Sequence, residues 1–282
     1  MEEALTTTEF PEPDSGSGEG TAANRFGRTS KLFLRAALQD GRTILKDVSF
    51  TAPYKVMTPF PGPGGGIKVM PLCASAGLMR GDRQELTYEV DAGADLEVLS
   101  QAFDKIHKME GGCASRRIRA RVAQGAVLQC APQPVIPFAG SAFESRAQIA
   151  LADETSRLYY LEILCAGRGA YHEEFAYRRF VSKVEITRGG RLIYRDNTCY
   201  EPSKMPMRGL GLFEGYTHLA NIFLSKPSPG VKEHIREFLE AEDLDGAVTI
   251  LADADLAVRI FSSRAQVLTA AAESIRGIWE MH

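Results

Sequence analysis

The feature that most constrains this chain is an alternation of apolar and polar residues with a period of two. Leu86, Tyr88 and Val90 alternate with Thr87 and Glu89. The same alternation recurs in two further stretches, whose apolar positions are Leu96 and Val98, then Ile118, Ala120 and Val122. Successive side chains of a β-strand point to opposite faces, so the pattern predicts strands with one packed face and one wet face. We therefore expect a mainly β protein.

A weak repeat with a central glycine separates these strands. Gly93, Gly125 and Gly189 each lie three residues after one apolar residue and three before the next. Gly93 and Gly125 are 32 residues apart, and Gly189 lies twice that distance beyond Gly125. Residues 151–158 form a fourth copy that is one residue longer and lacks the glycine. The repeat predicts an elongated, β-helix-like stack of strands, a distorted β-solenoid or sandwich. The alternative is that ordinary β-hairpins reuse a glycine turn.

The last sixty residues differ from this body. Residues 232–241 are charged and contain neither glycine nor proline, which predicts a helix after Pro229 and Gly230. Residues 247–251 and 256–261 read as short strands, and residues 263–279 as a closing helix. One face of that helix carries Val267, Leu268, Ala271, Ile275 and Ile278. We expect a small α/β cap with about two helices.

The N-terminal segment is unlike everything after it. Six acidic residues precede the first basic one, Arg25, and residues 11–18 have almost nothing to bury. This composition predicts a disordered acidic tail over residues 1–27. Residues 28–282 are then expected to form a single domain, with a β-body over 28–225 and the cap over 226–282.

Composition excludes several classes of protein. A net charge of −3 leaves no electrostatic footprint for nucleic acid. No apolar run approaches the roughly 20 residues that span a bilayer, and no secretory signal is visible at the N-terminus. Five cysteines form an odd set without a CxxC pair, which is typical of free thiols in a reducing compartment. We expect a cytoplasmic protein that binds neither nucleic acid nor membrane.

The sequence contains no recognisable catalytic machinery. The histidines are scattered, with no HExxH or similar spacing for zinc, at His107, His172, His218, His234 and His282. There is no GxSxG motif, and the glycine-rich residues 62–66 lack the Lys-Ser/Thr of a phosphate-binding loop. We therefore expect a protein that is not an enzyme.

Some polar residues nevertheless occupy unusual positions. Asp82 follows Gly81, where an aspartate commonly caps a turn. Ser100 ends a strand on the same face as Leu96 and Val98, where a hydrogen-bonded core hydroxyl is the simpler interpretation. Glu173 lies in a stretch that could bend, with Arg168 pairing with it for purely structural reasons.

Two neighbours of this bend are weaker candidates for metal contact. Cys165 and His172 could bind a soft or borderline metal ion. A lone cysteine and a lone histidine are more often a core residue and a surface residue, so both interpretations stay open.

Several motifs together resemble one known family. They are Ala76-Gly77-Leu78-Met79-Arg80-Gly81-Asp82, Ser100 to His107, Pro132 to Phe138, Gly167-Arg168 with Ala170 and Glu173, Asp196 to Thr198, and Phe213 to His218. In this order and spacing the chain is similar to the urease accessory protein D family, called H in some organisms, and closest to the H-named branch. The resemblance runs from about Lys31 to about Leu224. His172 departs from it, since many members have glycine there, and the acidic tail is not a family feature.

The resemblance implies a non-catalytic scaffold for nickel insertion into urease. Family members have a β-helical body and bind accessory protein F, which docks the accessory GTPase G, and the assembly engages apo-urease. Nickel is then transient cargo, with no tightly bound cofactor, and Asp82, Ser100 and Glu173 match polar positions proposed to line an internal channel. Oxygen ligands suit such a conduit because they hold Ni²⁺ more weakly than imidazole or thiolate clusters do.

The closing helix has two possible roles in such an assembly. Its apolar face could dock the helical partner, or it could cover the β-body. Two rival functions also stay open. One is a β-solenoid enzyme acting on polysaccharide, against which the single tryptophan argues weakly. The other is an interaction scaffold that works without metal.

Overall fold

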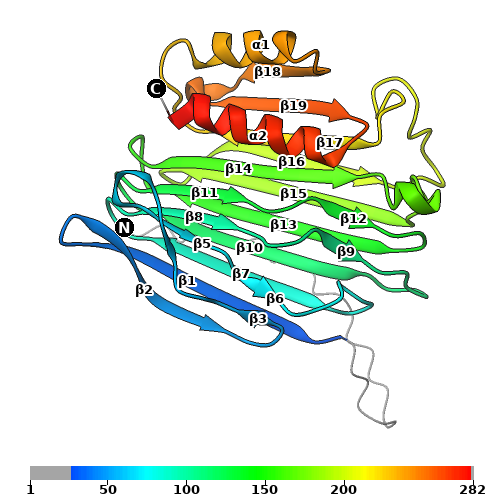
Figure 1. Ribbon diagram of the computed structural model, residues 1–282, viewed down its shortest axis with the longest axis horizontal. Coiled ribbons are helices and arrows are strands. Elements are labelled where there is room, and N and C mark those ends of the chain that lie inside the picture. Colours follow the sequence, from blue (N-terminus) through cyan, green and yellow to red (C-terminus); the bar gives the residue numbers. More distant parts are fainter. Residues whose placement is uncertain (1–26, 281–282) are drawn as a thin grey trace, which may run out of the picture.

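Two stacked β-sheets with both parallel and antiparallel pairs form the body of the molecule in the computed structural model, which describes residues 27–280 (Figure 1). The seven-stranded sheet has the order β16-β15-β13-β10-β7-β1-β2. Its strands in chain order are β1 (Thr29–Gln39), β2 (Arg42–Phe50), β7 (Arg83–Val90), β10 (Ala114–Val122), β13 (Ala142–Leu151), β15 (Arg179–Arg188) and β16 (Arg191–Tyr200).

The second sheet is built around the order β18-β19-β17-β14-β11-β8-β5-β4. Its strands are β4 (Phe60–Pro61), β5 (Ile67–Val69), β8 (Asp95–Leu99), β11 (Val127–Ala131), β14 (Arg157–Cys165), β17 (His218–Leu224), β18 (Gly246–Ile250) and β19 (Leu256–Ser262). The short strands β9 (Asp104–Ile106) and β12 (Val135–Pro137) pair beside it, and β3 (Tyr54–Lys55) pairs with β6 (Leu72–Cys73).

Strands β7, β8, β10, β11, β13, β14 and β15 follow one another while alternating between the two sheets, with β9 and β12 in the connections at one end. The expected alternation is confirmed, because Leu86, Tyr88 and Val90 are buried while the residues between them are partly exposed. Gly93 and Gly125 both have positive φ in the turns that cross from one sheet to the other. The mainly β prediction is thus confirmed. Both sheets are open, so the β-helix part of it is not confirmed.

The third copy of the glycine repeat behaves differently from the first two. Gly189 and Gly190, both with positive φ, join β15 to β16, and these strands pair antiparallel within one sheet. The turn over residues 186–192 therefore ends the parallel run instead of crossing to the other sheet. Each edge of the seven-stranded sheet is therefore an antiparallel hairpin: β15 and β16 form one, and β1 and β2 form the other.

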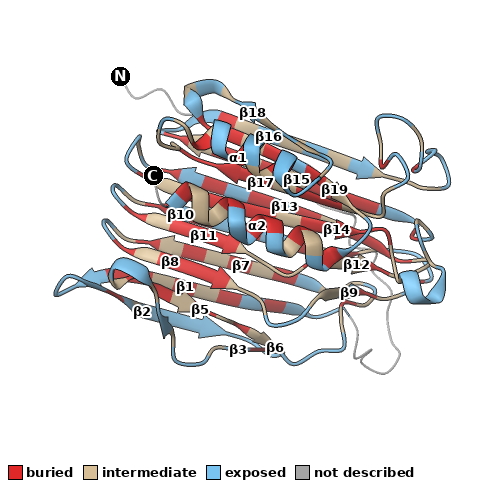
Figure 2. Ribbon diagram, turned by 45° about the horizontal axis from the view of Figure 1, so that its top comes forward, coloured by how far each residue is buried: buried red, intermediate tan, exposed pale blue. Residues whose placement is uncertain are grey.

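The predicted C-terminal elements are present. Within residues 27–280 there are two α-helices, α1 (Val231–Ala241) and α2 (Ala265–Glu280). The strands of the expected cap are not a separate layer, because β19 pairs with β17 and so continues the larger sheet. Helix α2 lies across the outer face of that sheet (Figures 1 and 2). Neither helix is long and apolar enough to cross a membrane.

Three apolar clusters hold these layers together. Two lie between the sheets and a third lies under the two helices. The cluster with Leu96, Ile118 and Leu128 is nearer the glycine turns, and the cluster with Ile106 and Phe143 is nearer the opposite end. The acidic tail predicted for residues 1–27 falls almost wholly outside the described residues.

Candidate functional site

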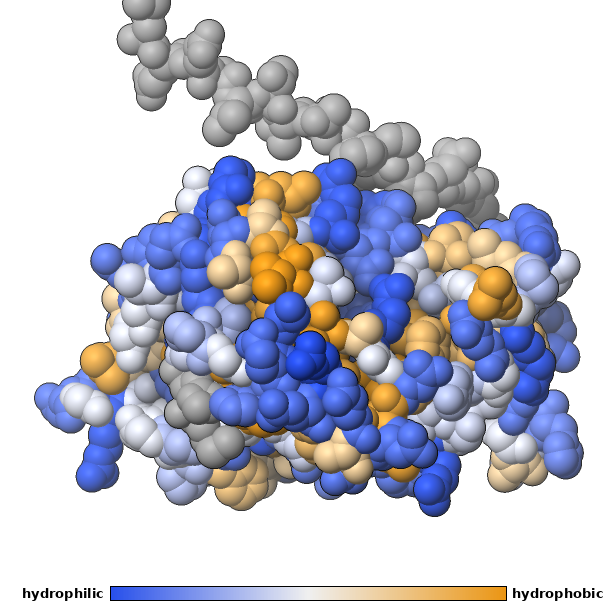
Figure 3. Space-filling model, turned by 90° about the horizontal axis from the view of Figure 1, so that it is seen from above, coloured by the Kyte–Doolittle hydropathy of each residue, from blue (hydrophilic) through white to orange (hydrophobic). Residues whose placement is uncertain are grey.

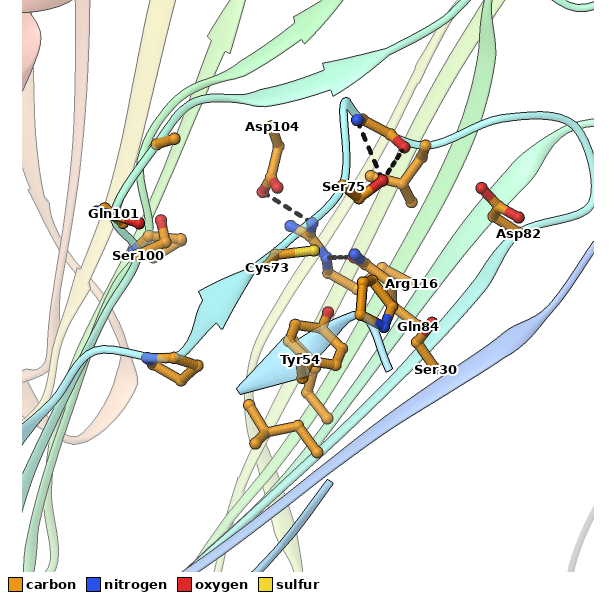
Figure 4. Close-up of a pocket in the computed structure, with 18 of the residues that line it drawn as sticks. Ser30, Tyr54, Cys73, Ser75, Asp82, Gln84, Ser100, Gln101, Asp104 and Arg116 are labelled. Carbon is orange, nitrogen blue, oxygen red and sulfur yellow. Dashed lines mark hydrogen bonds and ion pairs between the residues drawn. The ribbon is translucent and has the colours of Figure 1, made fainter. Parts of the chain in front are cut away.

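A cavity of about 400 Å³ lies between the two sheets. Strands β1, β7 and β10 contribute to one wall and β8 and β11 to the other, while β3, β6 and the loops around Gly77 cover it. We call this the outer cavity. Its polar lining residues are Arg28, Ser30, Tyr54, Cys73, Ser75, Asp82, Gln84, Ser100, Gln101, Asp104, Lys105 and Arg116, most of which Figure 4 labels. The charged side chains among them are two carboxylates, Asp82 and Asp104, and three basic groups, Arg28, Lys105 and Arg116.

Asp82 lies on one side of the outer cavity, in the turn that leads into β7. Its Oδ2 accepts a hydrogen bond from the backbone N–H of Met79 at 2.8 Å, and its Oδ1 accepts one from Gly27 at 3.2 Å. The preceding Gly81 has a φ of 81°, in the region that favours glycine. Asp82 therefore caps its turn and also lines the outer cavity.

Ser100 lines the same cavity from the end of β8. Its Oγ accepts a hydrogen bond from the backbone N–H of Gln133 at 2.6 Å. The hydroxyl is thus hydrogen-bonded, as the simpler interpretation required, and it also borders open space. Asp82 and Ser100 thus line one cavity, and their role in a nickel channel stays a prediction.

An ion pair in the outer cavity escaped the sequence analysis. Arg116 on β10 donates from Nη2 to Oδ2 of Asp104 at 2.7 Å and from Nε to Oε1 of Gln84 at 2.9 Å (Figure 4). The side chain of Arg116 is 8% exposed and that of Asp104 is 21% exposed. Burial by itself would lower the pKa of Arg116, but the Asp104 carboxylate raises it above its usual range. Arg116 is therefore a fixed positive charge.

A second, smaller cavity of about 40 Å³ adjoins the first, and we call it the inner cavity. Arg116, Ile118 and Pro132 line both cavities and so form their shared wall. The inner cavity contains Glu162 of β14, whose carboxylate accepts hydrogen bonds from Ser182 Oγ at 2.9 Å and from Tyr160 at 3.1 Å. Burial raises the pKa of Glu162 above its ordinary value, while these two hydroxyls oppose the shift.

Glu173 lies elsewhere and lines neither cavity. Its Oε2 accepts a hydrogen bond from Nε of Arg168 at 2.7 Å and another from the backbone N–H of Ala139 at 3.2 Å. Its hydrogen bond with Arg168 lowers the pKa of Glu173. The Arg168 guanidinium also lies 4.0 Å from the ring centroid of Phe138. This is the structural pairing considered as the alternative, so the structure does not bring Glu173 together with Asp82 and Ser100.

The weaker metal candidates lie in opposite environments. Cys165 is 1% exposed, and burial raises the pKa of its thiol to about 12. His172 is exposed and has a φ of 56°. Among residues 27–280, no three histidine, cysteine or acidic side chains converge as a metal site would require.

The apolar face of α2 packs against the chain's own sheet. Leu268, Ala271 and Ile275 are buried in the cluster under the helices, so they cover the sheet in the capping role considered as the alternative. Val267 and Ile278 remain partly exposed. Viewed from the α1 end, the surface is largely hydrophilic, with apolar residues gathered in smaller areas (Figure 3). Docking of a partner on α2 stays a prediction, and Val267 and Ile278 are the side chains still partly accessible for it.

Comparison with known proteins identifies a family with which this chain shares sequence similarity. A family profile described as "UreD urease accessory protein" matches residues 28–282. The urease accessory protein UreD of Acetivibrio thermocellus is 38% identical over 259 residues, which cover 90% of this chain and 98% of that protein. The urease accessory proteins UreH of Helicobacter pylori strain G27 and of Helicobacter acinonychis are each 36% identical, covering 89% of this chain and 95% of theirs. Relatives under both names thus match at similar identity.

Proposed function

The chain belongs to the UreD family of urease accessory proteins, and we propose that it passes Ni²⁺ toward apo-urease through the two cavities between its sheets. Its role in urease maturation, and the fact that it is a maturation factor and not an enzyme, follow from the family. The nickel path, the specific partners and the cytosolic setting are part of the proposal. In it, accessory protein F binds this chain, the GTPase G docks through F, and nickel is cargo with no tightly bound cofactor.

The observation that carries the proposal is the row of oxygen ligands along the two cavities. Asp82, Ser100 and Asp104 line the outer cavity, and Glu162 lies in the inner one. Each carboxylate offsets part of the cost of moving a dication out of water. Because no three histidine, cysteine or acidic side chains converge among residues 27–280, an ion would bind weakly enough to move on. Glu173 has no place on this path.

The test removes charge from the path without removing volume. We expect Asp104→Asn and Glu162→Gln each to lower nickel-dependent urease activation by about tenfold or more, since each removes a charge that stabilises the ion. Glu185→Gln is the matched control, because Glu185 lies on β15 outside both cavities and pairs at the surface with Arg195. Activation is measured as urease activity after incubation of the full assembly with Ni²⁺.

Co-purification of each variant with urease and the F-type and G-type accessory proteins separates transport from assembly. Normal activation by both variants in intact complexes contradicts the nickel path and favours the metal-independent scaffold. Lost complexes would instead assign these carboxylates to assembly.

A further inference from the structure

The wall between the two cavities is formed in part by a buried ion pair. Arg116 lines both cavities, and its guanidinium is held on one side by Asp104 at 2.7 Å and by Gln84 at 2.9 Å. The side chain is 8% exposed, and its guanidinium carbon lies 5.6 Å from the ring centroid of Phe143. These contacts fix the positive charge at the point where the outer cavity meets the inner one.

A cation that moves inward meets this charge. Repulsion between like charges grows as the surroundings become less polar, and it doubles for a divalent ion. Beyond the wall lies Glu162, which is within electrostatic reach of Arg116. Arg116 therefore lies between an outer carboxylate, Asp104, and an inner one, Glu162.

From this geometry, and resting on the proposed nickel path, we propose that the Arg116–Asp104 ion pair is a gate that admits divalent cations from the outer to the inner cavity. In the closed state Asp104 holds the guanidinium in place. A divalent ion in the outer cavity takes over the Asp104 carboxylate, because it brings twice the charge to the same oxygen atoms. The guanidinium then loses its anionic partner and is repelled by the ion, which opens the way to Glu162.

The gate also discriminates by charge. A monovalent ion brings no more charge than the guanidinium, whose charge-assisted hydrogen bond to Asp104 it would have to replace. Sodium and potassium ions are therefore left in the outer cavity. Arg116 acts as a specificity-determining residue, because it makes the Asp104 carboxylate available only to a stronger competitor.

The test times the arrival of nickel in the inner cavity of the full-length protein. Ser145 lines only the inner cavity and is 6% exposed, so Ser145→Cys places a thiol there with little change in volume. After rapid mixing with Ni²⁺, thiolate coordination is followed by its charge-transfer absorption. The signal of the same protein with Ser145 intact is subtracted, because Cys73 and Cys130 line the outer cavity.

Comparing arginine, methionine and lysine at position 116 separates the effect of the charge on the arrival rate from the effect of side-chain packing. Arg116→Met keeps the length and removes the charge, and we expect nickel to reach the thiol about tenfold faster or more. Arg116→Lys keeps the charge, and we expect it to stay closer to the parent rate than to the Met variant. Equal rates for parent and Met variant overturn the gate, as do equally fast Lys and Met variants. An absorption band that forms in none of the proteins overturns it as well.

Variants at position 104 act in the opposite direction. Asp104→Asn leaves Arg116 charged and removes the carboxylate that the ion must take over, so we expect slower arrival than in the parent. Each single variant leaves one partner of the buried ion pair without its counter-charge, which could prevent folding. The double variant Arg116→Met with Asp104→Asn removes both charges and so avoids this problem. It should be faster than Asp104→Asn, and an equal rate counts against the gate. Melting curves confirm that each protein is folded.

The rate measurement is made without urease, so a negative result would reject the gate without rejecting the proposed function. Unchanged arrival rates together with lowered urease activation would reject the gate and keep the nickel path. Altered arrival rates with normal activation would keep the gate as a barrier to cations and reject its use in urease maturation.

Discussion

At the scale of single residues, Asp95 is a half-buried carboxylate that lies outside the two cavities. It begins β8 at the end of the molecule with the glycine turns. Burial, followed by the charges of Glu280 and Glu97, raises the pKa of Asp95 to about 6. At pH values between about 4 and 6, the folded protein therefore holds a proton on Asp95 that the unfolded chain has released. Between about pH 4 and pH 6, this residue makes stability fall as pH rises.

Asp95→Asn should consequently stabilise the protein at neutral pH. We expect the free energy of unfolding at pH 7 to rise by about 1–2 kcal/mol, a value reduced because the side chain is partly exposed. At pH 4, where the carboxyl group of the folded protein is protonated, the gain should disappear. Urea unfolding at both pH values checks this. A gain of equal size at both would show that titration of Asp95 does not contribute.

The site residues differ in how visible they are in the sequence. Asp82 and Ser100 could be named because they belong to motifs that resemble a family. Arg116 was not predicted, although the sequence carries a signal for it. It lies two residues before Ile118, so it points to the same inward face of the strand as Ile118 and Ala120, whereas its neighbour Arg117 points outward. Glu162 likewise interrupts an apolar strand. Sequence periodicity shows that such a residue faces inward, but it does not show which distant residue it meets.

At the scale of elements, α2 is an integral part of the larger sheet's packing. Trp279 is fully buried, and its Nε1–H donates to the backbone oxygen of Ser225 at 2.9 Å. Tyr159 of β14 donates from its hydroxyl to the backbone oxygen of Ala272 at 2.8 Å. The Arg157 guanidinium lies 4.1 Å from the ring centroid of Trp279. Apolar packing and hydrogen bonds together therefore fix the helix on the sheet.

Trp279→Ala should accordingly destabilise the protein by about 3–5 kcal/mol, because it removes a large buried side chain and leaves a cavity. Glu273→Ala is the matched control on the same helix, since Glu273 is exposed, and we expect a change below about 0.5 kcal/mol. Urea unfolding of both variants measures the difference. A loss below about 1 kcal/mol for Trp279→Ala would mean that α2 contributes little to stability.

The elements themselves were largely predictable, and their pairing was not. The predicted range 232–241 is close to α1, and the predicted strand 256–261 is close to β19. The glycine repeat correctly marked turns at Gly93, Gly125 and Gly189. The repeat could not distinguish a crossing between sheets from a hairpin, because both use glycine with positive φ. The outcome depends on which distant strand edge is free to pair.

At the scale of the whole molecule, the proposed nickel path depends on the space between the two sheets. The charged residues of the two cavities come from strands that are separate in the sequence. They are Asp104 of β9, Arg116 of β10 and Glu162 of β14, and the stacking of the two sheets brings them together. The mainly β class followed from the alternation of residues. The cavities did not, because they depend on how side chains from both sheets fill the interior between two apolar clusters.

The most direct test of a cation path between the sheets is X-ray diffraction from crystals soaked in Ni²⁺, with data collected at the nickel absorption edge. Anomalous difference density locates nickel without any assumption about function. We predict density in the outer cavity beside the Asp104 carboxylate, and a second position near Glu162 in crystals of Arg116→Met. Density confined to exposed side chains such as His172, with both cavities empty of nickel, would contradict the path.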